Sequence, residues 1–212
     1  MRDEKMSWII GIDEVGRGAL AGPVAVAALA LPQNFQKKYL RQSASIKLRD
    51  SKKLSSKQRE VWFRWVKNQA LPHAVALVSP KIIDRINISQ AANLAATKAF
   101  LKLLTNNKQL TINNCKVFLD GGLYVQNKTK LKNLKTYKFK TIIKGDEKIP
   151  AISLASIVAK VYRDKLMKKL HKKYPRYDFI HNVGYGTKKH IKAIKKYGLS
   201  SIHRRSFSIQ SI

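Results

Sequence analysis

The longest apolar run in the chain, residues 23–31 (PVAVAALAL), has only the length of a β-strand. A helix that crosses a membrane needs roughly 18 or more apolar residues in a row, so we expect no membrane span. Further apolar runs of strand length lie at 7–12, 74–78, 115–119 and 139–143. The strands cluster early in the chain and later alternate with helical patterns. This order predicts an α/β fold, a mixed sheet with helices packed on it.

Capping residues mark the helices that accompany these strands. Ser55, with Gln58 three residues later, forms a capping box for a helix that carries Trp62 and Trp65 on its apolar face. We interpret both tryptophans as core residues.

Three further helices are expected, over 90–104 with Ser89 as its cap, over 151–170, and between Thr187 and Gly198. No linker divides the chain. We therefore predict a single domain over 1–212, with a core at about 6–164 and a helical C-terminal extension at about 165–212.

The charge of the chain points to a polyanionic partner. Lysine and arginine number 43 against 12 acidic residues, which gives a net charge of +31. Nucleic acid is the first candidate partner and an anionic membrane surface the second. The single cysteine, Cys115, excludes an internal disulfide, is expected to pack in a strand and suits a reducing compartment. No signal peptide is visible, so we expect a cytoplasmic protein.

Acidic residues are rare here, and three predicted strands stop at them. Asp13 and Glu14 follow the first strand, Asp120 follows the fourth, and Asp146 lies just beyond the fifth. If these strands are neighbours, four carboxylates meet and repel one another unless a cation is present. Oxygen ligands favour Mg²⁺ or Mn²⁺. Acids that hold metals within a basic protein are typical of a phosphodiesterase site.

Two considerations limit this hypothesis. An acid after a strand is commonly a turn former or a helix cap, and Asp120 and Asp146 both stand beside glycines. Adjacent residues of a regular strand also point to opposite faces. Asp13 and Glu14 therefore share a site only if the strand ends or twists there, which Gly16 permits.

Residues 11–24 (GIDEVGRGALAGPV) resemble the signature of the ribonuclease HII family. Further blocks resemble the family in the same order: 50–54 (DSKKL), 119–121 (LDG), 144–146 (KGD), 155–164 (ASIVAKVYRD), 184–187 (GYGT) and 203–207 (HRRSF). The blocks span nearly the whole chain. Few residues precede the first strand, whereas the sister type of the family carries an extra N-terminal domain. Arg49 and Leu154 depart from the family pattern and are expected to affect substrate contact and helix packing, respectively.

The resemblance implies a ribonuclease H-like fold with a mixed five-stranded sheet. It implies that the catalytic and metal-binding acids are Asp13, Glu14, Asp120 and Asp146. It further implies that the segment Gly16-Arg17-Gly18 contacts the ribonucleotide and that Tyr185 senses its 2′-hydroxyl.

Other interpretations of these residues stay open on the sequence alone. Arg17 also suits a surface salt bridge, and Tyr185 also suits a side chain that caps the core. Lys52, Lys53 and Lys160 are candidate phosphate contacts, although a lysine in so basic a chain is commonly just solvated.

The sequence and the resemblance together predict an endoribonuclease that hydrolyses the RNA strand of RNA/DNA hybrids. It should also nick duplex DNA on the 5′ side of single ribonucleotides, as in ribonucleotide excision repair. Two ions about 4 Å apart, Mn²⁺ or Mg²⁺, would leave 3′-hydroxyl and 5′-phosphate ends. The rival hypotheses are a non-catalytic basic nucleic-acid-binding protein and a nuclease of the same fold that acts on DNA or junctions. We expect a monomer with no obligate protein partner, and residues 208–212 (SIQSI) show no sliding-clamp docking motif.

Overall fold

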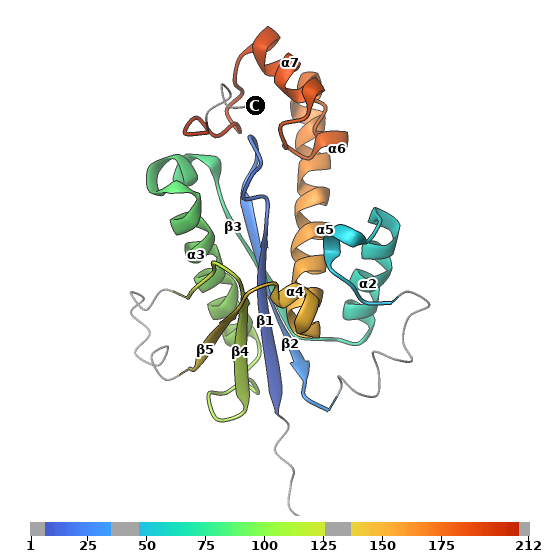
Figure 1. Cartoon of the computed structure of the whole chain (residues 1–212), viewed down its shortest axis with the longest axis vertical. Helices are drawn as coiled ribbons and strands as arrows, with labels where there is room; N and C mark the ends of the chain where they lie inside the picture. The colour runs from blue at the N-terminus through green and yellow to red at the C-terminus, as the bar shows by residue number, and fades with distance from the viewer. Residues whose placement is uncertain (1–6, 35–46, 126–136, 208–212) are drawn as a thin grey trace, which may run out of the picture.

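A computed structural model describes residues 7–34, 47–125 and 137–207 of the chain. Among these residues, five strands form one mixed sheet in the order β3-β2-β1-β4-β5 (Figure 1). Their bounds are β1 Trp8–Val15, β2 Val24–Pro32, β3 His73–Val78, β4 Cys115–Asp120 and β5 Phe139–Ile142. The pairs β1–β2 and β2–β3 are antiparallel, and β1–β4 and β4–β5 are parallel. The predicted α/β fold with a mixed five-stranded sheet is confirmed.

The interior strand β2 is buried on both faces, which explains its uninterrupted apolar sequence. Successive side chains of a strand alternate between the two faces, so β2 serves two cores. Its side chains toward one core cluster are Val24, Val26, Ala28 and Ala30. Those toward the other cluster are Ala27, Leu29 and Leu31.

Helices cover each face of the sheet (Figure 1). The long helix α3 (Pro80–Asn106) supplies the first core cluster, and α2 (Ser56–Asn68) and α5 (Pro150–Lys173) supply the second. The capping box of Ser55 and Gln58 that starts α2 is confirmed. Trp62 and Trp65 are core residues as predicted.

The packing of α5 against the sheet is close. A Cβ atom placed on Gly11 of β1 would lie 2.1 Å from the backbone carbon of Ala151, so only a glycine allows the helix this near the strand. Leu154, the departure noted in this helix, is fully buried in the second core cluster.

The cap predicted for the helix over 90–104 is wrong, and the helical segment that precedes it was not predicted. The helix begins at Pro80 rather than after Ser89, and its backbone breaks at Asn87, where φ is 63°. The side-chain oxygen of Asn87 accepts a hydrogen bond of 3.0 Å from the backbone N–H of Gln90. Asn87, and not Ser89, therefore caps the second segment of the helix, because its side-chain oxygen accepts a hydrogen bond from a backbone N–H in the first turn, where a helix offers no acceptor of its own.

The C-terminal part packs on the end of α5 through a third core cluster that includes Met167, Phe179 and Ile194. It contains the short helix α6 (Phe179–Asn182) and α7 (Lys188–Tyr197). Thr187 caps α7 and Gly198 ends it, as predicted. Helix α5 runs without interruption through residue 165, the expected boundary of the extension.

Over the described ranges, no helix is both long and apolar enough to cross a membrane. The tail whose sequence bears on clamp docking, 208–212, lies outside the described residues.

Candidate active site

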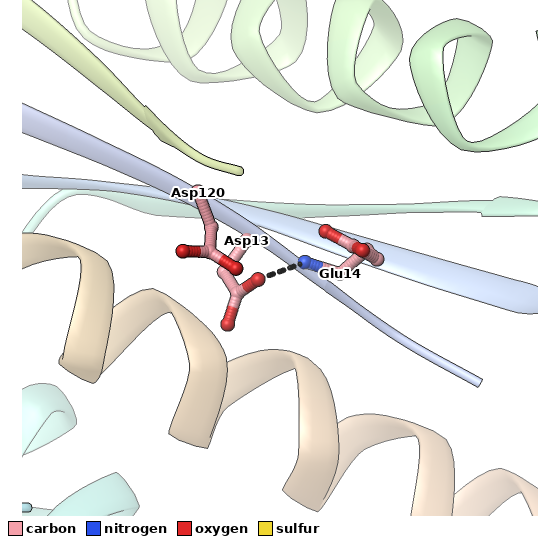
Figure 2. A group of neighbouring side chains, drawn as sticks. All are labelled: Asp13, Glu14 and Asp120. Carbon is pink, nitrogen blue, oxygen red and sulfur yellow. Dashed lines mark hydrogen bonds between the residues drawn. The ribbon is translucent and has the colours of Figure 1, made fainter. Parts of the chain in front are cut away.

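The acidic residues gather at the carboxyl ends of the central parallel strands. In the ladder between β1 and β4, the last paired residues are Ile12 and Leu119. The next residue of each strand is an aspartate, which brings Asp13 and Asp120 side by side (Figure 2). The hypothesis that neighbouring strand ends unite these acids therefore holds for this pair.

Glu14 joins the pair although β1 does not end where we expected. The strand continues to Val15 along β2, but its pairing with β4 stops at Ile12, so its β4 edge is open beyond that residue. One carboxylate oxygen from each of Asp13, Glu14 and Asp120 lies within 4.8 Å of the other two.

Asp146 approaches from the short helix α4 (Gly145–Lys148). The backbone N–H of Gly145 donates a 2.7 Å hydrogen bond to Oδ1 of Asp120, which ties α4 to β4. The hydroxyl of Ser153 donates to the backbone carbonyl of Asp146. Asp146 is buried beside Asp120 but is not one of the three acids within 4.8 Å.

The four acids line a cleft of about 480 Å³. The same cleft is lined by Gly16, Arg17, Gly18, Lys52, Lys160 and Tyr185. Of the predicted catalytic and substrate-binding residues, all but Lys53 line it, and Arg49, which was expected to affect substrate contact, does not line it either. The ammonium of Lys53 forms a 2.8 Å ion pair with Glu147 on the outside of α4.

Burial and mutual repulsion raise the pKa values of the acids. Burial is the largest cause for Asp13, followed by Glu14 and then Asp120, and together they hold its pKa well above the usual value. Burial raises the pKa of Glu14 as well, against the opposing charge of Arg17. Asp146 also has a raised pKa, from burial first and Asp120 second. The cluster is thus costly to ionise without a counter-charge.

A divalent cation fits this donor set. Oε2 of Glu14 is buried and has no hydrogen-bond partner among the described residues, so the site leaves an acceptor without a donor. Carboxylate oxygens within 4.8 Å of one another are ligands suited to Mg²⁺ or Mn²⁺, whose charge would relieve the repulsion.

Basic and aromatic groups occupy the other wall of the cleft. Arg17 lies 3.4 Å from Glu14 and donates a 3.2 Å hydrogen bond to the hydroxyl of Ser89 on α3. The half-buried ring of Tyr185 has the ammonium of Lys160 5.7 Å from its centroid and the guanidinium carbon of Arg163 at 5.4 Å. Tyr185 thus lies against two cations of α5 and lines the cleft.

Sequence reasoning missed two serines of the cleft. The hydroxyls of Ser51 and Ser156 are 2.8 Å apart and buried, and Ser156 also hydrogen-bonds Asp13. Because an ionised Asp13 can only accept, Ser156 donates to it and accepts from Ser51. Both serines stand in blocks that carried the resemblance, which was the one signal that could have found them.

Comparison with known proteins agrees with this geometry. A family model described as Ribonuclease HII matches residues 10–210. The chain belongs to the ribonuclease HII family. The ribonuclease HII of Endomicrobium trichonymphae is 46% identical over 200 residues, which cover 94% of this chain and 85% of that protein. The ribonuclease HII of Pelagibacter ubique (strain HTCC1062) is 43% identical over 203 residues, covering 96% of this chain and 97% of its own.

A solved structure shows the same fold. The crystal structure of ribonuclease H2 from Pyrococcus horikoshii OT3 superposes with a TM-score of 0.67 at 26% identity, covering 95% of this chain and 94% of that one.

Membership of the ribonuclease HII family makes the protein a metal-dependent ribonuclease H, a hydrolase of RNA/DNA hybrids. The non-catalytic alternative is thereby excluded.

Proposed function

We propose that this ribonuclease HII nicks duplex DNA on the 5′ side of a single ribonucleotide, in addition to cutting the RNA strand of hybrids. The observation that carries the proposal is the composition of the cleft. It unites the acids Asp13, Glu14, Asp120 and Asp146 with the segment Gly16-Arg17-Gly18 and Tyr185 in one cavity. Hydrolytic and recognition groups thus face the same nucleotide.

The four acids are the proposed catalytic and metal-binding residues. Asp13, Glu14 and Asp120 hold the centre, because their oxygens lie within 4.8 Å of one another. Asp146 completes the site from α4. Two bound divalent ions, Mn²⁺ or Mg²⁺, would lower the pKa of the attacking water and stabilise the leaving 3′-oxygen.

We assign recognition of the 2′-hydroxyl to Gly16-Arg17-Gly18 and Tyr185. Gly16 and Gly18 carry no side chain, so the backbone can approach the minor groove there. Tyr185 lines the same cleft, as does Lys160, whose ammonium is a candidate phosphate contact. A site built to bind a hydroxyl discriminates strongly against its absence, because its polar groups are then left unpaired.

The two predicted lysines of the block 50–54 differ in their support as phosphate contacts. Lys52 lines the cleft, which favours the role. Lys53 is engaged by Glu147 and would have to leave that ion pair first. The described residues of one chain supply the whole cleft, which supports action as a monomer.

The test uses two end-labelled duplexes of one sequence, the first with a lone ribonucleotide and the second with a long RNA tract. Denaturing gels should show cleavage of both, on the 5′ side of the lone ribonucleotide, with 3′-hydroxyl and 5′-phosphate ends. Tyr185→Ala should lose most cleavage at the lone ribonucleotide while Mn²⁺ binding by calorimetry is retained.

Two results would contradict the proposal. A 2′,3′-cyclic phosphate end would show that the 2′-hydroxyl is the nucleophile. Cleavage confined to the long tract would remove recognition of single ribonucleotides and leave only the hybrid activity.

A further inference from the structure

The C-terminal segment Ile202–Arg204 lies against the loop that follows β1. His203 forms an isolated β-bridge with Ala21, and the backbone N–H of Arg204 donates a 2.8 Å hydrogen bond to the carbonyl of Leu20. Figure 1 shows the part of the chain that follows α7, up to residue 207, at the same end of the molecule as this loop. Residues nearly two hundred positions apart in the chain are thus joined beside the cleft.

The side chain of Arg204 binds the backbone of the segment Gly16-Arg17-Gly18 and of Gly22. Its guanidinium donates to the carbonyl oxygens of Gly16 at 2.7 Å, Arg17 at 2.7 Å and Gly22 at 3.0 Å. The residue is 1% exposed and does not line the cleft. Arg204 therefore contacts the backbone of the segment on the side turned away from the substrate.

These bonds set the direction of two peptide groups. In a planar trans peptide the N–H points opposite to the C=O. Because the carbonyls of Gly16 and Arg17 point at Arg204, the N–H groups of Arg17 and Gly18 point away from it. Within the described part of the chain, neither N–H donates a hydrogen bond. Both donors are therefore left for a ligand in the cleft.

The arrangement is stiff because Arg204 is a buried charge. None of its hydrogen bonds within the described ranges goes to a carboxylate, and burial together with nearby Arg163 lowers its pKa to about 9. A desolvated charge that loses a hydrogen bond is costly, and no water replaces the partner at a fully buried position. The carbonyls cannot swing away from Arg204 without that cost.

The same contacts connect the segment to the loop of Tyr185. The N–H groups of Leu20 and Ala21 donate to the carbonyl of Gly184 at 2.8 and 3.1 Å. The guanidinium of Arg163 bridges the carbonyls of Ala21 at 3.0 Å and Val183 at 2.8 Å. These hydrogen bonds hold the loop that follows β1 and the loop of Tyr185 in a fixed position relative to each other.

We propose that Arg204 is a positioning residue for ribonucleotide recognition: it aims the backbone donors of Arg17 and Gly18 into the cleft and holds them in register with Tyr185. The inference rests on the proposed function, since it deepens the account of the same site. Arg204 touches no reacting atom, and its effect passes through the peptide groups that it binds.

The test compares Arg204→Lys with Arg205→Lys. The lysine at 204 keeps the charge but cannot make three forked bonds. Arg205 is the matched control, because it is the next residue, it is exposed, and its side chain makes no hydrogen bond within the described ranges. Arg204→Met and Arg205→Met form a second pair that removes the charge.

Two readouts separate positioning from a general loss of structure. The kcat/KM for the lone-ribonucleotide duplex should fall about tenfold in Arg204→Lys, as expected for lost charge-assisted bonds. The Kd for plain DNA of the same sequence should stay within about twofold, as should both quantities in Arg205→Lys. Nitrogen-15 relaxation of the free protein should show mobile amides at Arg17 and Gly18 in Arg204→Lys only.

The outcomes are distinguishable. Wild-type kcat/KM in Arg204→Lys, unchanged amide relaxation, or equal losses in both lysine variants would overturn the role of Arg204. If Arg204→Met unfolds, Arg204→Lys decides. If the wild type leaves the lone ribonucleotide uncut, the proposed function fails, and amide relaxation alone then decides whether Arg204 orders the segment.

Discussion

At the scale of single residues, the cluster of ionised acids destabilises the protein unless a bound cation offsets the repulsion between them. Asp13 is buried, faces Glu14 and Asp120, and gains hydrogen bonds from Ser156 and from the N–H of Glu14 at 2.7 Å. The pKa of Asp13 is nevertheless raised. Burial and repulsion therefore destabilise its ionised form by more than the hydrogen bonds stabilise it.

A stability measurement on Asp13→Asn should show this cost. A raised pKa means that the native state binds more protons than the unfolded chain, so stability falls as pH rises from about 4 through the raised pKa. In EDTA at pH 7, Asp13→Asn should therefore resist urea better than the wild type, by about 1.4 kcal/mol per unit of pKa shift. The gap should close near pH 4. A wild type equal or superior at pH 7 in EDTA would contradict the account.

At the scale of elements, two buried histidines join α7 to the C-terminal segment. Nδ1 of His190 lies 2.8 Å from the carbonyl of Tyr185, so it carries the proton, and Nε2 accepts. His203 then donates from Nε2 over 3.0 Å to His190 and accepts on Nδ1 from the N–H of Ser200. All four ring nitrogens are hydrogen-bonded only while both rings are neutral.

This arrangement predicts a loss of stability on acidification. Burial first, and His190 second, lower the pKa of His203 to about 4, below the 6.5 of the unfolded chain. The unfolded chain thus binds more protons between about pH 4 and 6.5, and the stability from this group falls as pH drops through that window. Urea unfolding of His203→Gln should show a weaker pH dependence there than the wild type. Identical dependence would show that the pair does not titrate on unfolding.

The element scale also shows which features the sequence could predict. Strands, the cap at Ser55 and the cap at Thr187 depend on neighbours in sequence, and they were predicted correctly. The break and the cap at Asn87 were not, because the local sequence does not indicate which residue adopts a positive φ, here 63°. The acids could be found because each lies at or just beyond the end of an apolar run in the sequence, whereas their meeting depended on strand order.

Contacts between distant residues set the limit of prediction. Nothing near Arg204 in sequence indicates that it binds the carbonyls of Gly16 and Arg17, and its neighbour Arg205 has the same side chain and is exposed. Similarly, Lys52 and Lys53 are equivalent in sequence, yet only Lys52 lines the cleft, because Glu147 engages Lys53.

At the scale of the whole molecule, the charge of +31 should govern affinity. Each phosphate contacted by a cation lowers the slope of log K against log salt by about 0.9 for duplex DNA. We expect Lys52→Ala to make the slope shallower by about 1, since Lys52 lines the cleft. Lys195→Ala, an equal charge change on α7, should leave the slope unchanged. Fluorescence anisotropy on plain duplex DNA, which should bind uncut, measures both. Equal slopes in the two variants would show that Lys52 does not contact the DNA.

The most direct test of the central claim, that these acids form a cation-dependent hydrolytic centre, is a Mn²⁺ titration of cleavage with Glu14→Gln beside Glu60→Gln. The substitutions are chemically identical, but Glu14 lies in the cluster and Glu60 pairs with Lys165 on the surface. Cleavage of an RNA/DNA hybrid should fall by at least about a hundredfold in Glu14→Gln, with weaker Mn²⁺ binding by calorimetry, and stay at the wild-type level in Glu60→Gln. Wild-type cleavage and Mn²⁺ affinity in Glu14→Gln would contradict the claim.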